Sequence, residues 1–294
     1  MLYFLELFIS GAIAGSLYAL VALAFVVIYK ATRVVNFALG ELVMFATGFV
    51  AMGLHKFGVG LIGALGVGIA GMTGVAAAFN YGVLRFLIGR PLIAFIMVTI
   101  GFGAVLRASA GWIFAGVPQS ISLPFPEQPI FIGELLLSPH ELLVGMVALV
   151  VIALVSWYFM RSRTGLALRA ISDDERAATA MGVNLTRYFT LTWGLAGAVT
   201  VAGGVLWTYI TGGGFSLVMV GLKILPIVII GGLESIPGVL IGAMLIGVLE
   251  SLTAGYIDPW LGAPVSGIIA YLMLILVLLV RPYGLFGERA IERV

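Results

Sequence analysis

Residues 268–280 read IIAYLMLILVLLV, a continuous hydrophobic run without a charged side chain. The run does not alternate between apolar and polar residues, as a strand of a membrane β-barrel would. The whole chain has the same character, because 62% of its 294 residues are hydrophobic and only 10% are charged. That composition leaves too little polar surface to cover a water-soluble globule. The sequence therefore predicts an all-α protein that crosses a membrane several times.

Similar runs recur along the chain, and a helix needs roughly 20 apolar residues to cross a hydrocarbon core about 30 Å thick. Together they predict a polytopic transmembrane helix bundle that occupies 1–294 as a single domain. Glycine lets such helices approach closely, as at Gly11 and Gly15, and we expect most of this packing to lie within one subunit. The predicted hydrophobic segments, about eight in all, are 7–29, 36–54, 60–84, 92–115, 141–160, 188–210, 222–252 and 265–281.

Basic residues in the predicted loops indicate how the bundle is oriented. Lys and Arg gather at 30–33, 85–90 and 161–187, which fall on one face if each earlier segment crosses the membrane once. The positive-inside rule makes that face cytoplasmic. The N-terminus is then outside, as is the loop 116–140, which contains neither Lys nor Arg. The net charge of +2 is too small to argue for binding to nucleic acid.

The seventh segment, 222–252, is longer than one span needs and is interrupted by the sequence IIGGLESIPG. The basic C-terminal tail belongs inside, which requires an extra crossing at this point. We therefore predict a broken or re-entrant pair, with Pro237 in the first turn of its second helix. Irregular backbone within a membrane is tolerated where it is buried in protein or lines a wet cavity, so Gly231, Gly232 and Glu234 are candidates for the substrate path. A proline kink packed against neighbouring helices is the alternative.

Charged residues within membrane spans are costly and usually face the bundle interior or water. Glu41 lies near the start of the second segment, close to Asn36 and Gly40. It is either a first-turn acid at the cytoplasmic interface or part of the substrate path. Arg107 lies deep in the fourth segment and either extends to the outer interface or pairs with an acid that lines the path. We take all four residues as candidates for the path.

The remaining isolated polar residues suggest no enzyme. Lys223 and Glu250 lie near segment ends and are interpreted as boundary residues. His55 and His140 have no second ligand at metal-binding spacing, so we predict no metal site. The chain contains no phosphate-binding loop, HExxH or GxSxG motif, and we predict neither catalytic residues nor a cofactor bound by this chain. Cysteine is absent, which excludes disulfides.

The loop 161–187 contains the stretch SDDERAATAMG, which has the signals of a short helix. Ser172 and Glu175 have the spacing of a capping box, and Gly182 can end the helix in a left-handed conformation. The predicted helix, 173–181, either docks on another protein or lies on its own bundle. Its apolar side would carry Ala177, Ala178 and Met181.

Four stretches, in this order, resemble the LivH-type permease family of branched-chain amino acid ABC importers over nearly the whole chain. They are GSLYALVALAFVVIYKATRVVNFALGELVMF, RPLIAFIMVTIGFGAVL, SRTGLALRAISDDERAATAMGVN with FTLTWGLAGAVTVAGGVL, and GGLESIPGVLIGAMLIGVLE. The chain departs from the family pattern at Leu39, where the NFAHGE motif usually has His, and at Glu234, where related sequences have Gly. Members of the family move leucine-type amino acids, urea, amides, and aromatic or other organic acids.

The resemblance implies a permease domain that works with several partners in a bacterial or archaeal cytoplasmic membrane. These are a second related permease (LivM-like) or a second copy of the chain, two cytoplasmic ATPase subunits that bind ATP and Mg, and an external solute-binding protein. The loop 161–187 would then be the coupling loop that contacts the ATPase. By that resemblance, the coupling residues are Gly165, Arg169, Asp173, Asp174, Glu175, Arg176, Ala177 and Gly182. A secondary transporter or a facilitative channel is the alternative function.

Overall fold

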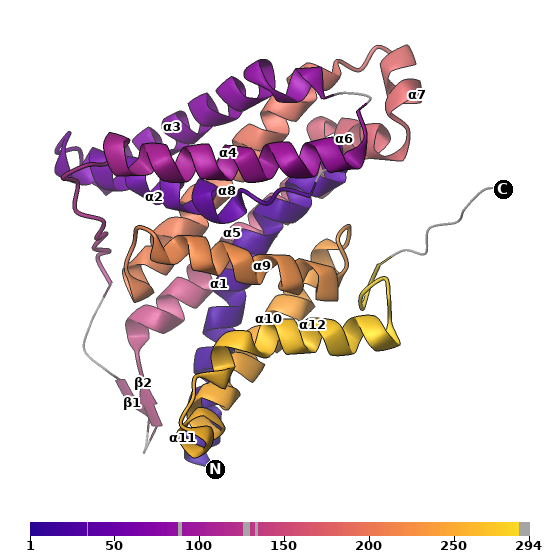
Figure 1. The fold of residues 1–294 in the computed structure, drawn as a ribbon. Helices are drawn as coiled ribbons and strands as arrows, with labels where there is room; N and C mark the ends of the chain where they lie inside the picture. The colour runs from indigo at the N-terminus through magenta and orange to yellow at the C-terminus, as the bar shows by residue number, and fades with distance from the viewer. Residues whose placement is uncertain (34, 88–89, 126–129, 133–134, 288–294) are drawn as a thin grey trace. The chain divides into compact units, whose positions relative to one another are not determined.

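The computed structural model describes all residues except 34, 88–89, 126–129, 133–134 and 288–294 (Figure 1). The described residues form nine apolar helices. Six of these helices are long enough to cross a membrane, and three are shorter. The predicted all-α bundle is therefore confirmed. The long helices are α1 (Leu2–Thr32), α3 (Leu61–Gly82), α4 (Leu92–Ile113), α5 (Pro139–Arg161), α8 (Leu185–Thr211) and α10 (Ile236–Tyr256); the shorter ones are α2 (Leu39–His55), α9 (Ser216–Gly231) and α12 (Ile269–Val280).

Short elements connect the apolar helices. In the predicted loop 116–140, β1 (Ile130–Ile132) pairs antiparallel with β2 (Leu135–Leu137), a hairpin that the sequence pattern does not predict. The other short elements are η1 (Leu84–Phe86), α6 (Arg163–Asp173), α7 (Glu175–Ala180), α11 (Asp258–Leu261) and η2 (Val265–Ile268). In η2, the Ser266 hydroxyl donates to Asp258 of α11 over 2.5 Å, which lowers the pKa of that carboxyl.

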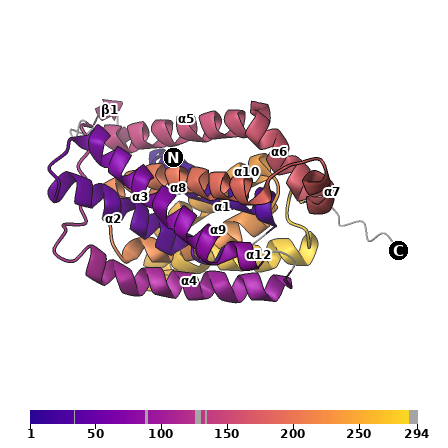
Figure 2. The ribbon, with the colours of Figure 1, turned by 90° about the horizontal axis from the view of Figure 1, so that it is seen from above.

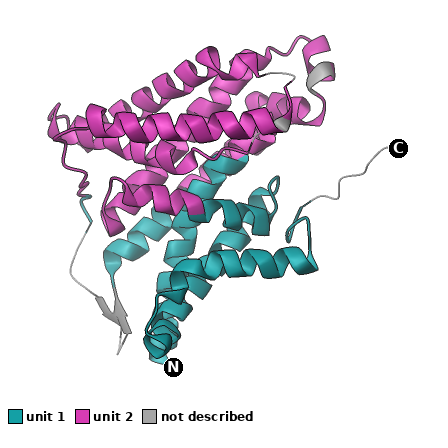
Figure 3. Cartoon of the chain, viewed as in Figure 1, with its two compact units in different colours: residues 1–26, 123–150, 223–294 teal, residues 27–122, 151–222 magenta. Residues whose placement is uncertain are grey.

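The chain divides into two compact units (Figure 3). Unit 1 comprises residues 1–26, 123–150 and 223–294, and unit 2 comprises 27–122 and 151–222.

In unit 2, helix α2 contacts α3, α4 and α8, and α3 also contacts α8 (Figures 1 and 2). Small residues permit this packing: a Cβ atom added at Gly53 of α2 would lie 2.8 Å from the Cα atom of Ala64 on α3. Aromatic rings fill the space between α3, α4 and α8, where Phe79 stacks on Phe102 with ring centroids 3.9 Å apart and meets Trp193 at 5.0 Å. Nearly all of α2 is buried by these neighbours.

In unit 1, glycines let α1 pack closely on α10. A Cβ atom at Gly15 would lie 2.8 Å from the Cα atom of Met244, and one at Gly11 would lie 2.7 Å from that of Val248. Carbon atoms in ordinary contact are about 3.5 to 4.0 Å apart, so only glycine fits at these positions without moving a helix. The expectation that Gly11 and Gly15 serve packing within one chain is confirmed.

The predicted interruption of the seventh segment is confirmed between α9 and α10. The chain turns at Gly232, whose φ of +103° is accessible to glycine. Ser235 then caps α10, because its hydroxyl accepts a hydrogen bond of 3.0 Å from the Gly238 amide, and Pro237 lies in the first turn as expected. Helix α9 begins at Ser216, six residues earlier than the predicted segment. At 1.5 Å per residue its 16 residues extend about 24 Å, most of a membrane core rather than half of one.

Candidate functional site

Helices α2 and α4 bring two of the predicted path residues together as an ion pair. Glu41 lies in the first turn of α2, and its carboxylate accepts a hydrogen bond from Nη2 of Arg107 on α4. The Glu41 side chain is only 5% exposed, whereas that of Arg107 is 52% exposed. The sequence left two readings open for each residue, and the structure favours the pairing of Arg107 with an acid. A buried carboxylate in a membrane span is stabilised by such a partner.

Asn36 and Gly40 lie where α2 begins, as predicted. The Oδ1 atom of Asn36 accepts a 3.0 Å hydrogen bond from the Ala38 amide, and the Asn36 side chain is buried before the first turn. Gly40 packs on α9, where an added Cβ atom would lie 3.0 Å from the Cα atom of Val218. These contacts position Glu41 at a helix start whose dipole favours its negative charge.

The other predicted path residues lie at the turn between α9 and α10, where Gly231 and Gly232 are buried. The C-terminal turn of the chain covers them: the Leu285 amide donates to the Ile230 carbonyl at 2.8 Å, and the Phe286 amide donates to the Gly231 carbonyl at 3.2 Å. Glu234 is half-buried in the same turn. The turn is thus packed against the C-terminal turn of its own chain, and a role of these residues in the path stays a prediction.

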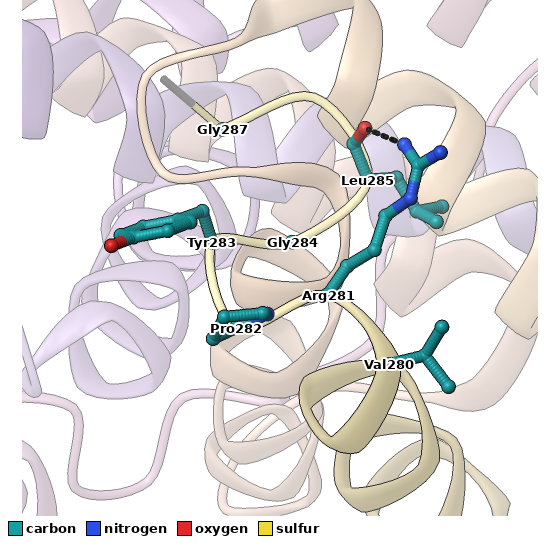
Figure 4. A pocket seen from close by; sticks show the side chains of 7 residues that line it. All are labelled: Val280, Arg281, Pro282, Tyr283, Gly284, Leu285 and Gly287. Carbon is teal, nitrogen blue, oxygen red and sulfur yellow. Dashed lines mark hydrogen bonds between the residues drawn. The ribbon is translucent and has the colours of Figure 1, made fainter. Parts of the chain in front are cut away.

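The C-terminal turn also borders a pocket of about 640 Å³ (Figure 4). Arg281 points across the turn and donates from Nη1 to the Leu285 carbonyl at 3.2 Å. This bond holds the end of α12 beside the turn. The pocket is lined by Val280, Arg281, Pro282, Tyr283, Gly284, Leu285 and Gly287.

A second ion pair, which the sequence analysis missed, joins α1, α9 and α10 in unit 1. Lys223 of α9 pairs with Glu250 of α10, and Tyr18 of α1 donates to the other carboxylate oxygen of Glu250 at 2.7 Å. The two charged side chains are 23% and 20% exposed. The interpretation of Lys223 and Glu250 as separate boundary residues missed this contact, and their position relative to the membrane boundary stays a prediction. The sequence does contain a signal for this contact, because the two helices of the predicted broken pair carry opposite charges, Lys223 and Glu250.

Each of the two histidines lies at the end of a helix. Nε2 of His55 lies 2.9 Å from the Ser120 carbonyl oxygen, and His140 lies in the first turn of α5. Among the described residues, no group of three or more His, Cys, Asp or Glu side chains is placed to hold a metal ion.

The predicted coupling loop forms two short helices, α6 and α7, rather than one. Ser162 caps α6, and a side chain at Gly165 would overlap the Phe159 carbonyl oxygen at the end of α5. Arg169 donates to the carbonyls of Phe159 and Met160, at 3.2 and 3.3 Å. A cation suits these last carbonyls of a helix, so Gly165 and Arg169 hold the loop against α5.

The predicted cap of the second helix was wrong. Ser172 stays within α6, which continues to Asp173, and its carbonyl accepts a 3.4 Å hydrogen bond from Arg33. Asp174 caps α7 instead, because its Oδ1 atom accepts a 2.9 Å hydrogen bond from the Ala177 amide. Gly182, with φ of +86°, ends the helix as predicted.

One face of α7 is buried and the other is exposed. Ala178 is only 5% exposed and packs inward, whereas Ala177 is exposed and Met181, just beyond the helix, is 85% exposed. Asp173 and Asp174 are exposed beside them. The side chains of Glu175 and Arg176 lie outside the described part of the structure. The helix therefore rests on its own chain, as in one of the two readings, with Ala177 exposed, and its docking on another protein stays a prediction.

Membrane-spanning helices that keep ion pairs among them are typical of membrane transport proteins. The comparison with known proteins narrows that class. Residues 7–278 match the family model described as branched-chain amino acid transport system / permease component. The chain belongs to this family and is a multi-pass permease subunit of an ABC transporter.

Two curated relatives illustrate the match. The high-affinity branched-chain amino acid transport system permease protein LivH of Salmonella typhimurium is 27% identical over all of this chain and 98% of its own length. The protein BraD of Pseudomonas aeruginosa, which bears the same description, is 28% identical over 99% of this chain and 98% of its own. Among solved structures, PsaBC from Streptococcus pneumoniae in complex with Fab has 16% sequence identity and a TM-score of 0.49, over 91% of this chain and 89% of that one.

Proposed function

We propose that the chain transports a branched-chain amino acid or a related small polar solute into the cell as part of an ABC importer. In this proposal an external binding protein delivers the solute, and two ATPase subunits on the cytoplasmic side supply the energy. The pore is completed by a second, related permease or by a second copy of the chain. This assignment is supported by the family match along residues 7–278 and by the similarity to the permeases LivH and BraD.

The observation that carries the proposed coupling to ATP is the arrangement of α6 and α7. The bonds of Arg169 and the close contact at Gly165 fasten the loop to α5, while Ala177 of α7 and Met181, just beyond that helix, stay exposed. A short helix that is firmly attached at its base and free on one face can transmit the movement of a partner to the bundle. We therefore assign the contact with the ATPase to this face.

Orientation follows from the same assignment. If α7 contacts a cytoplasmic ATPase, the loops at 30–33 and 85–90 are cytoplasmic as well, and the N-terminus is outside. Counting α9 and α10 as separate crossings places the C-terminus inside. The membrane is then the cytoplasmic membrane of a bacterium or archaeon.

Reconstitution tests the function. Proteoliposomes that contain the permease, its second permease subunit and the ATPase subunits should take up radioactive L-leucine only when the binding protein and internal ATP are both supplied. Omitting the ATPase subunits is the critical control. Uptake that continues without them would identify a secondary transporter or a channel and would overturn the proposal.

A further inference from the structure

The charged groups of an amino acid are its main obstacle in a membrane. A zwitterionic amino acid carries an ammonium and a carboxylate group, and removing either from water is expensive unless an opposite charge replaces the lost hydration. A transport path for such a solute needs at least one cation and one anion within reach of each other. Among the described residues of the spans, two ion pairs meet this condition: Arg107 with Glu41, and Lys223 with Glu250.

The Lys223–Glu250 pair of unit 1 has little capacity left to bind a solute. Both oxygens of Glu250 are occupied, one by Lys223 and the other by the Tyr18 hydroxyl. The Lys223 ammonium also lies 3.5 Å from the Tyr18 oxygen. Three helices thus contribute one polar group each to a cluster that satisfies itself. Such a cluster stabilises the packing of α1, α9 and α10 but offers no free oxygen for a solute cation.

The pair in unit 2 differs in this respect. In the described part of the chain, Arg107 donates to a single oxygen of Glu41, although a guanidinium has five N–H donors. The Oε2 atom of Glu41 accepts no hydrogen bond from the described residues. The guanidinium is half exposed on a membrane helix, where contact with lipid is unfavourable and contact with a polar solute or water is favourable.

Small residues of α4 border the pair, so the buried carboxylate of Glu41 is open only on the side of the half-exposed Arg107 guanidinium. A Cβ atom at Gly103, one turn before Arg107, would lie 3.3 Å from Oε2 of Glu41 and would crowd that oxygen. The α4 residues on the same face as Arg107, Ala104 and Gly111, are small and exposed. A Cβ atom at Gly111 would meet nothing within 4 Å. No bulky side chain of α4 at these positions therefore blocks the guanidinium.

We propose that Arg107 and Glu41 form the binding site for the charged end of a zwitterionic amino acid. The free N–H groups of Arg107 donate to the α-carboxylate, for which the planar guanidinium is the best-matched partner. The Oε2 atom of Glu41 accepts from the α-ammonium. The pair need not separate, because each partner keeps its present bond. This inference rests on the proposed transport function and narrows its substrate class: urea and simple amides lack both charges and gain nothing from the site.

The test uses the full-length chain in lipid nanodiscs, without binding protein, and measures weak binding by saturation-transfer NMR. The probes are L-leucine, 4-methylpentanoate, which is leucine without its amino group, and 3-methylbutylamine, which is leucine without its carboxylate. We expect Glu41→Gln and Arg107→Gln each to weaken L-leucine binding about tenfold, the usual scale for losing one hydrogen bond to a charged group. Arg107→Lys, which keeps the charge, should weaken it less.

The pattern across probes separates binding from folding. Glu41→Gln should weaken L-leucine but leave 4-methylpentanoate unchanged, because that probe has no ammonium to lose. Arg107→Gln should weaken L-leucine but leave 3-methylbutylamine unchanged. A variant that is merely misfolded would weaken all probes alike, and that outcome would overturn the assignment. So would unchanged binding of L-leucine to both variants, or no binding to the wild-type chain.

Failure of this inference is distinguishable from failure of the proposed function. If the reconstituted importer takes up L-leucine in an ATP-dependent manner while both variants bind it normally, only the site assignment is wrong. If ATP-dependent uptake itself is absent, the function is wrong whatever the nanodiscs show.

Discussion

Replacing Gly15 by alanine should separate α1 from α10. The new Cβ atom would lie 2.8 Å from the Cα atom of Met244 and 2.9 Å from the carbonyl oxygen of Ala243. Ordinary carbon contacts are about 3.5 to 4.0 Å, so the helices must part by roughly 0.7 to 1.2 Å. Both obstacles are backbone atoms and cannot rotate away. We expect a loss of about 1 to 3 kcal/mol in the free energy of unfolding, the usual cost of overpacking.

The same movement should disturb the polar cluster of unit 1. Tyr18 lies one turn after Gly15, and its 2.7 Å hydrogen bond to Glu250 spans the two helices that are pushed apart. The measurement is unfolding in mixed detergent micelles, followed by tryptophan fluorescence. Gly74→Ala on α3 is the matched control, because its Cβ atom would meet nothing within 4 Å. Alanine there should stabilise the helix by up to about 1 kcal/mol. Equal unfolding free energies for Gly15→Ala and wild type would refute the reasoning.

Three further outcomes are expected. Ala178→Pro removes the 3.0 Å bond from that amide to the Asp174 carbonyl, so it should cost about 3 kcal/mol locally and abolish co-purification of the ATPase subunits without preventing membrane insertion. Glu250→Gln leaves the Lys223 ammonium without its anion; because the pair is partly exposed, we expect a loss of about 1 to 3 kcal/mol in the same unfolding assay. In the cysteine-free chain, Met181→Cys should react with a membrane-impermeant maleimide only from the cytoplasmic side; labelling from outside would reverse the proposed orientation.

The membrane spans were predictable because lipid imposes one strong condition on sequence. A spanning helix must be apolar for about 20 residues, and eight apolar segments could therefore be recognised in the sequence. The start of α9 was less visible, since the residues from Ser216 to Leu222 are as apolar as those that follow and only the glycines at 212–214 separate them from α8. The hairpin of β1 and β2 was missed because two strands of three residues carry almost no periodic signal.

The caps in the charged loop show how local signals compete. Ser172 with Glu175 and Asp174 with Ala177 both offer an acceptor three residues before a helical amide. The first pair has the better capping-box pattern, yet α6 starts early at the Ser162 cap and continues through Ser172. A helix that is already growing costs less to extend than a new one costs to nucleate, so the later acceptor becomes the cap. Proline at residue 178 would therefore remove a backbone hydrogen bond of the helix, whereas residue 177 lies in the first turn and its amide bonds only the Asp174 side chain.

The ion pairs were only half predictable from sequence. Glu41 and Arg107 could each be recognised as costly in a membrane, but their pairing depends on a contact between helices whose residues are 66 positions apart. The pairing of Lys223 with Glu250 could not be recognised from the position of each residue within its own helix, because the contact lies between two helices. Which charges meet is decided by the rotation of each helix about its axis, and nearly uniform apolar segments such as α1, α5 and α10 contain little information on that rotation.

The two ion pairs differ in how many of their hydrogen-bonding groups are occupied, so we expect different results when each pair is replaced by apolar residues. Exchanging a satisfied buried ion pair for apolar residues of similar size is often neutral or stabilising. Lys223→Met and Glu250→Leu, combined with Tyr18→Phe because the Tyr18 hydroxyl would lose its bond to Glu250, should therefore preserve the unfolding free energy. If this cluster only stabilises the helix packing, the triple variant should preserve uptake as well. Glu41→Leu combined with Arg107→Met should preserve or raise the unfolding free energy but eliminate uptake. A stable chain without transport would show that the half-exposed Arg107 is retained at the expense of stability because the solute requires it.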